Sequence, residues 1–148
     1  MKILKQLTIL VLLMGMCLAH AQNDRSDGQH PVVGSWIFDA STFETRMDPG
    51  TKQRLDTIPA HKNAIMAFYI GRTETFSLDG SYTVTLADGS TLVGQWAAQN
   101  NNIVLITTPD GSVFRKRISF PAPNRLVMVN IASGDTKSII TETHFVKN

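Results

Sequence analysis

The sequence predicts an all-β protein: an eight-stranded antiparallel up-and-down barrel with one helix inserted between its first and second strands. Turn signals recur at intervals of about ten residues, which is the spacing of consecutive hairpins in sandwiches and barrels. The expected connections between successive strands are short, which favours a meander. Closing the meander into a barrel removes its exposed edges.

Each predicted strand is a short run rich in β-branched and aromatic residues. In several runs the side chains alternate: Tyr82 and Val84 share one face, for example, and Ser81 and Thr83 share the other. Asp-Gly pairs separate several runs, and this dipeptide is a strong signal for a tight hairpin. The expected strands are residues 32–38, 73–78, 81–86, 91–97, 103–108, 113–120, 125–131 and 137–146.

A helix is expected at residues 58–70, because the segment 39–72 is too long for a plain loop. Thr57 is the expected cap, Pro59 lies in the first turn and Gly71 is the expected stop. The helix either plugs one end of the barrel or forms a lid over a cavity mouth, and the burial that an apolar helix needs favours the plug. The apolar stripe consists of Ile58, Ile65, Met66, Tyr69 and Ile70.

The first 21 residues have the organisation of a cleavable export signal. Lys2 and Lys5 precede an apolar stretch that is too short for a comfortable transmembrane helix. The small residues Ala19 and Ala21 stand where a signal peptidase reads the chain. We therefore expect an exported protein, periplasmic or secreted, that begins at Gln22 and has no transmembrane segment.

Cys17, the only cysteine, offers the alternative of lipoprotein anchoring. The bulky Met16 directly before it favours the soluble form. Cleavage would leave no cysteine, which excludes disulfides, cysteine nucleophiles and thiolate metal sites. It would also remove two of the 14 basic residues, so that 12 remain against 12 acidic ones. A neutral chain without a basic cluster is a poor binder of nucleic acid.

The rest of the chain, like the full length of 148 residues, suits a single domain. Residues 22–31 are polar and lack periodicity, so we expect a disordered lead-in. Residues 32–148 then form the barrel domain.

Three short motifs occur in a characteristic order along the chain. They are Gly34-Ser35-Trp36, Phe76-x-x-Asp79-Gly80-x-Tyr82 and Gly94-Gln95-Trp96, followed by a hydrophobic strand at residues 126–129. This pattern resembles that of exported bacterial lipocalin-like proteins, which are small calycin-type barrels, along most of residues 32–146. The resemblance implies a non-enzymatic protein that binds a small molecule inside the barrel.

Trp36 suits a role in closing one end of the barrel. An indole buries a large apolar area while its N–H finds a carbonyl, and Gly34 lets a neighbouring strand approach closely. The lipocalin resemblance further implies a basic side chain from a late strand stacked over Trp36. Arg115, Arg117 and Arg125 are the candidates.

No metal site and no cofactor are expected. His30, His61 and His144 are far apart, and no second ligand accompanies any of them at a suitable spacing on a shared face. Ser90 and Ser112 follow Asp-Gly pairs, where turn formation explains them without catalysis.

An acid–base pair is also not expected. Glu74 and Glu142 can approach one another across a closed barrel, but strand carboxylates are more often outward and solvated. The chain has no G-x-S-x-G motif and no phosphate-binding glycine loop. We therefore predict that the protein is not an enzyme.

The expected interior is bulky, which argues for a modest pocket. Lys116 lies either inside, where it would be a natural partner for a ligand carboxylate, or outside, and the strand pattern leaves both faces open. Met66, Phe68 and Tyr69 can line the pocket mouth. The expected inward set is Trp36, Phe76, Tyr82, Val84, Trp96, Leu105, Phe114, Ile118 and Met128.

Two functions remain. The first is a non-enzymatic exported binder of a small hydrophobic ligand in the barrel. The alternative is a protein-interaction module, an inhibitor or an envelope assembly factor, in which a filled barrel presents its loops to a partner protein. An open apolar cavity would support the first function and a packed interior the second. The expected ligand-binding residues are Met66, Phe68, Tyr69, Tyr82, Trp96, Phe114 and Lys116.

Overall fold

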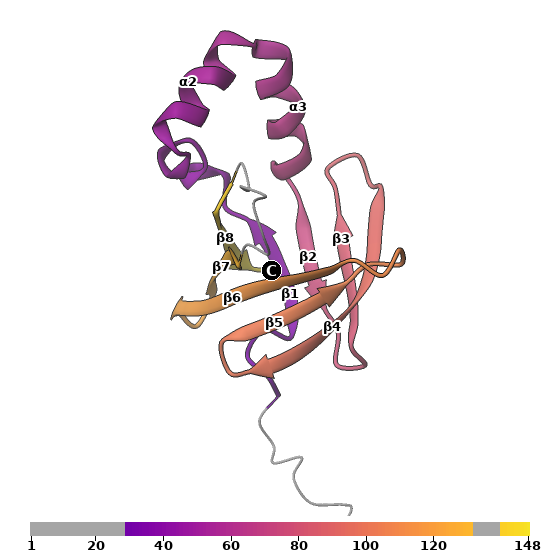
Figure 1. Ribbon diagram of the computed structural model, residues 1–148. Helices are drawn as coiled ribbons and strands as arrows, with labels where there is room; N and C mark the ends of the chain where they lie inside the picture. The colour runs from indigo at the N-terminus through magenta and orange to yellow at the C-terminus, as the bar shows by residue number, and fades with distance from the viewer. Residues whose placement is uncertain (1–28, 132–139) are drawn as a thin grey trace, which may run out of the picture.

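Eight antiparallel strands form a closed barrel in which each strand pairs with the next along the chain and β8 pairs with β1 (Figure 1). The structure is a computed structural model that describes residues 29–131 and 140–148. The predicted up-and-down barrel is thus confirmed. Its strands are β1 (Gly34–Phe38), β2 (Thr73–Phe76), β3 (Ser81–Thr85), β4 (Thr91–Asn100), β5 (Ile103–Thr107), β6 (Val113–Ala122), β7 (Arg125–Ile131) and β8 (Glu142–Lys147).

The Asp-Gly pairs form turns between strands, as predicted. Gly80, Gly89 and Gly111 all have positive φ angles, which glycine adopts without steric cost. The preceding aspartate accepts hydrogen bonds from the backbone and hydroxyl groups of the following serine, as at Ser90 and Ser112. These two serines therefore have a structural role in the turns.

The segments predicted at the two ends of the chain fall partly outside the described residues. The predicted signal peptide, Cys17 and most of the predicted lead-in lie outside the described residues. At the end of that lead-in, His30 packs against Trp96 with ring centroids 5.8 Å apart. The last strand begins at Glu142, later than the predicted strand 137–146, of which residues 137–139 also lie outside the described part.

Two helices, rather than the single predicted one, lie between β1 and β2. They are α2 (Pro49–Thr57) and α3 (Pro59–Tyr69), and two short 3₁₀ turns, η1 (Ala40–Thr42) and η2 (Glu44–Arg46), precede them. In Figure 1 the two helices stand beyond one end of the barrel. No helix among the described residues is long and apolar enough to span a membrane.

The α2 helix was missed because it is polar and has no buried residue, so it lacks an apolar stripe. Its start does carry a readable signal: Asp48 accepts a hydrogen bond from the Thr51 backbone N–H at 2.9 Å, and Pro49 follows the cap. Thr57 is not the cap of α3, since its hydroxyl donates to the Arg54 carbonyl at the end of α2.

The α3 helix confirms the prediction for residues 58–70. Ile65, Met66 and Tyr69 pack on the core, whereas Ile58 and Ile70 at its two ends are exposed. Gly71 follows the helix with a φ of +74°, which is the conformation of the expected glycine stop.

The core lies on the inner face of the barrel wall. Six of the expected inward residues are buried: Trp36, Phe76, Tyr82, Val84, Ile118 and Met128. The expectation for Leu105 was wrong, because Val104 and Ile106 are the buried residues of β5. The run Ile103–Thr107 is apolar at four consecutive positions, so alternation could not identify its inner face.

Candidate functional site

The two ends of the barrel differ in the residues that line them. The end next to the helices, where β1 ends and β2 begins, is called the helix-side end below (Figure 1). The opposite end is called the far end. At the far end, the indole N–H of the fully buried Trp36 donates to the Val32 carbonyl at 2.7 Å. This supports the predicted role of Trp36 in closing that end.

The cation over Trp36 is Lys147, whose Nζ lies 5.3 Å from the ring centroid. None of the three arginine candidates stacks there. Arg115 donates to Gln99, and Arg125 forms an ion pair with Asp39. Closure of the barrel explains the difference, because pairing of β1 with β8 places Lys147 directly opposite Trp36.

A buried polar cluster occupies the interior toward the helix-side end. Glu74 is fully buried on β2, and its carboxylate pairs with the Arg72 guanidinium. The Tyr82 hydroxyl donates to the second oxygen of Glu74 at 2.6 Å. Both carboxylate oxygens therefore have strong partners, as a buried charge requires.

Arg72 connects this cluster to the α3 helix. Its Cζ lies 4.8 Å from the ring centroid of Tyr69 and 5.3 Å from that of Phe68, within the range of cation–π attraction. Only 9% of the Arg72 side chain is exposed, yet its Nε has no hydrogen-bond partner among the described residues.

Lys116 belongs to the same interior. It pairs in register with the buried Val104, so the inward alternative is the correct one. Its ammonium donates to the Asn130 side-chain oxygen at 2.7 Å. Within residues 29–131 and 140–148, no carboxylate forms an ion pair with Lys116.

Burial and charge shift the titration of these groups in different directions. Burial lowers the pKa of Lys116, the Glu74 charge offsets part of this and the Arg72 charge adds to it. Burial together with Glu74 raises the pKa of Tyr82, so the phenol remains a donor. Burial lowers the pKa of Arg72, but the charge and hydrogen bond of Glu74 outweigh it and the pKa is raised.

The inner wall next to this cluster is only partly covered. Leu92 pairs with the buried Val84, and Phe114 pairs with the buried Ile106, so both side chains belong to the inner face. Both are nevertheless 51% exposed. The far end contrasts with this, since Trp36 and other inner-face residues there are buried.

The predicted ligand-binding residues therefore separate into groups. Tyr82, Phe114 and Lys116 lie on the inner face of the barrel wall. Met66 and Tyr69 pack on the core from α3, and Phe68 is 40% exposed beside Arg72.

Trp96 belongs elsewhere. It lies in the far-end packing, where its ring contacts Phe76 and its N–H donates to the Ser77 carbonyl. No motif in the sequence marks Arg72, and Glu74 was expected outside; the one signal for an inward Glu74 was that the 73–78 strand must have an inward face.

The expectation about paired carboxylates was wrong in its details. Glu74 is inside the barrel, contrary to the expected outward orientation, whereas Glu142 is on the outer side of β8. The two cannot act as an acid–base pair because the barrel wall separates them.

The expectation that no histidine has a carboxylate neighbour on its own face was also wrong. The Nε2 of His144 lies 2.5 Å from a Glu142 carboxylate oxygen, and Arg46 also pairs with Glu142. Across residues 29–131 and 140–148, no group of three or more potential ligands is arranged to hold a metal ion.

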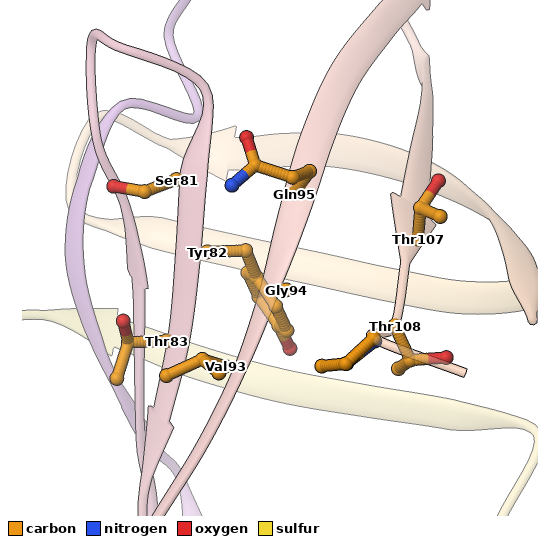
Figure 2. Close-up of a pocket in the computed structure, with 9 residues that line it drawn as sticks. Ser81, Tyr82, Thr83, Val93, Gly94, Gln95, Thr107 and Thr108 are labelled. Carbon is orange, nitrogen blue, oxygen red and sulfur yellow. The ribbon is translucent and has the colours of Figure 1, made fainter. Parts of the chain in front are cut away.

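A pocket of about 320 Å³ opens where β4 separates from β5 (Figure 2). The ladder between these strands begins at the Gln95–Thr107 pair, so the start of β4 pairs only with β3. Gly94 lies above the Tyr82 ring, and a Cβ on Gly94 would be 3.6 Å from it. The pocket is lined by Ser81, Tyr82, Thr83, Val93, Gly94, Gln95, Thr107, Thr108 and Pro109.

The fold and the interior together define a class: an all-antiparallel closed barrel with a charged cluster inside and a helical hairpin beyond one end. Comparison of the chain with protein-family models, curated proteins and solved structures found no match.

Proposed function

We propose that the protein is a non-enzymatic, lipocalin-like binder of a small hydrophobic molecule, held inside the helix-side end of the barrel. The observation that carries this proposal is the exposure of inner-face side chains. Leu92 and Phe114 share the face of buried core residues but remain 51% exposed. An apolar ligand that covers them would remove apolar surface from water, which is favourable.

The neighbouring residues support the same location. Phe68 presents a 40% exposed ring from α3, and Arg72 links that ring to the interior cluster. Small-molecule sites typically combine apolar walls with a few polar groups that orient the ligand, and this end of the barrel has both. An exported location, periplasmic or secreted, is part of the proposal and rests on the signal-like first 21 residues.

The test uses a neutral apolar fluorescent probe, N-phenyl-1-naphthylamine. The wild-type protein should bind it, and Phe114→Asp should weaken binding at least about tenfold, because an unpaired carboxylate would face the apolar ligand. Leu78→Asp is the matched control, since Leu78 is 76% exposed and lies in the β2–β3 turn at the far end. Absence of probe binding by the wild type, or equal loss in both variants, would refute the proposal.

Phe68→Asp distinguishes a lid from a plug. If α3 acts as a lid, the substitution lowers probe affinity more than it lowers stability, which the 40% exposure of Phe68 favours. If α3 is only a plug, the charge destabilises the domain by several kcal/mol. Probe affinity and thermal stability measured on this one variant separate the two.

A protein-interaction module is the second candidate, and the open edge of β4 favours it. Val93 is 58% exposed beside the position where β4 loses its β5 partner. Val113 is 54% exposed at the start of β6. Exposed strand edges of this kind are templates for added strands. Failure of the probe test combined with capture of a partner that Val93→Lys abolishes would support this function instead.

A further inference from the structure

We propose that the ligand of the helix-side end carries a single carboxylate, which the Lys116 ammonium and the Arg72 guanidinium bind inside the barrel. This inference rests on the proposed function, because it names the chemical class of the molecule bound at the same site. The ligand is accordingly an amphiphile: an apolar body with one negatively charged head group.

The charge balance of the interior is the first argument. In the described part of the chain, three charged side chains form the inner cluster: Arg72, Glu74 and Lys116. Arg72 and Glu74 neutralise one another as an ion pair. Among the described residues, Lys116 remains as one net positive charge, and its hydrogen-bond partner is the neutral side-chain oxygen of Asn130.

An unsatisfied donor is the second and independent argument. The Arg72 side chain is about nine-tenths buried, and its Nε lacks a hydrogen-bond partner among the described residues. A buried donor without a partner carries a desolvation cost, which an incoming acceptor relieves. The charges of Arg72 and of its partner Glu74 both act on Lys116, so an anionic group bound at Lys116 would also be attracted by Arg72.

The position of the cluster explains why the ligand is expected to be amphiphilic. Lys116 is two residues from the half-exposed Phe114 on the same face of β6. A carboxylate at Lys116 therefore places the rest of the molecule against Phe114 and Leu92. One net positive charge matches one carboxylate, whereas a phosphate monoester would bring about two negative charges at neutral pH.

Among the described residues, the Lys116 ammonium has a neutral amide oxygen as its hydrogen-bond partner and no carboxylate in an ion pair. Burial lowers the pKa of this ammonium more than Glu74 restores it. A bound carboxylate would supply the missing counter-charge and raise that pKa again. Binding of the acid should for this reason be accompanied by proton uptake at any pH where part of the Lys116 population is unprotonated.

The test compares two probes that share one apolar body, dodecanoate and dodecan-1-ol, each competing with N-phenyl-1-naphthylamine. The wild type should bind dodecanoate at least tenfold more tightly than the alcohol. Lys116→Met should reduce this preference to within twofold while keeping the affinity for the alcohol. The variant is expected to fold, because a methionine removes a buried charge without leaving another one unpaired.

Arg115→Met is the matched control, since Arg115 is the preceding residue of β6 and is exposed on the other face. It should retain the full preference for the acid. Equal binding of acid and alcohol by the wild type would overturn the inference and leave the proposed function standing. Unchanged preference in Lys116→Met would also overturn it. If neither compound binds the wild type, the proposed function fails and the inference fails with it.

Discussion

Glu74 holds together the charged interior, so its replacement should be among the most damaging in the barrel. Glu74→Leu removes the partner of the Arg72 guanidinium and of the Tyr82 hydroxyl. It also leaves two cations, Arg72 and Lys116, without a carboxylate partner among the described residues of this interior. Breaking a buried ion pair from one side typically costs about 3–5 kcal/mol, and we expect a loss of unfolding free energy in that range.

Arg72→Met should cost less than Glu74→Leu. The Glu74 carboxylate would keep the Tyr82 hydroxyl as a donor at 2.6 Å and the Lys116 charge nearby. The double variant Arg72→Met/Glu74→Leu removes both charges and leaves neither unpaired. Replacing a buried pair by apolar residues is often neutral or stabilising, so the double variant should be within about 2 kcal/mol of the wild type.

Equilibrium urea unfolding of the wild type, the two single variants and the double variant gives the required double-mutant cycle. A coupling energy of at least about 2 kcal/mol is expected between the two positions, within the range seen for contacting residues. If Glu74→Leu cost less than about 1 kcal/mol, Glu74 would not be a buried, paired carboxylate. A double variant as unstable as Glu74→Leu alone would refute the charge argument and indicate a packing effect.

Three further predictions concern other parts of the structure. Trp36→Ala should destabilise the fold by about 3–5 kcal/mol in urea melts, as large aromatic truncations in cores do. A loss of unfolding free energy below about 1 kcal/mol would mean that the indole does not close the far end. Gly94→Ala should lower the free energy of unfolding by about 1–3 kcal/mol. The added Cβ would lie 2.7 Å from the Thr107 carbonyl oxygen, and the backbone of a paired strand cannot move away without disturbing its hydrogen bonds. Unchanged stability would contradict this contact. A hydrogen bond from His144 lowers the pKa of Glu142 below 4.5. The ionised Glu142 therefore stabilises the fold above pH 4.5, and this stabilisation is lost as the pH falls through the lower folded-state pKa. In urea melts Glu142→Gln should differ from wild type by at most about 1 kcal/mol at pH 7 and should converge with it in acid; a difference that persists in acid would exclude ionisation of Glu142 as its cause.

Local sequence signals were sufficient for the arrangement of strands. The alternation of Tyr82 and Val84 with polar neighbours predicted which face of β3 is buried, and both residues are buried. The Asp-Gly pairs predicted the turns because glycine alone tolerates positive φ there without cost. Trp36 could be assigned to the core from its size and from its place in the first strand. These features depend on residues close together in the chain.

The interior charge cluster depended on tertiary structure. Strand periodicity left the orientation of Lys116 open and gave no reason to place Glu74 inside, because a shift of one residue exchanges the two faces. The register between neighbouring strands decides that face, and it placed Lys116 beside Val104 and Phe114 beside Ile106.

Barrel closure decided the remaining contacts. The pairing of β1 with β8 brings Lys147 over Trp36, although 110 residues of sequence separate the two and three arginines lie nearer. Burial of Glu74 is tolerated because Arg72, in the connection between α3 and β2, and Tyr82, on β3, both contact its carboxylate. The sequence by itself determined which segments are strands and turns. The closed barrel determined which side chains contact one another, because the contacting residues are distant in the chain and come together only when every strand has paired.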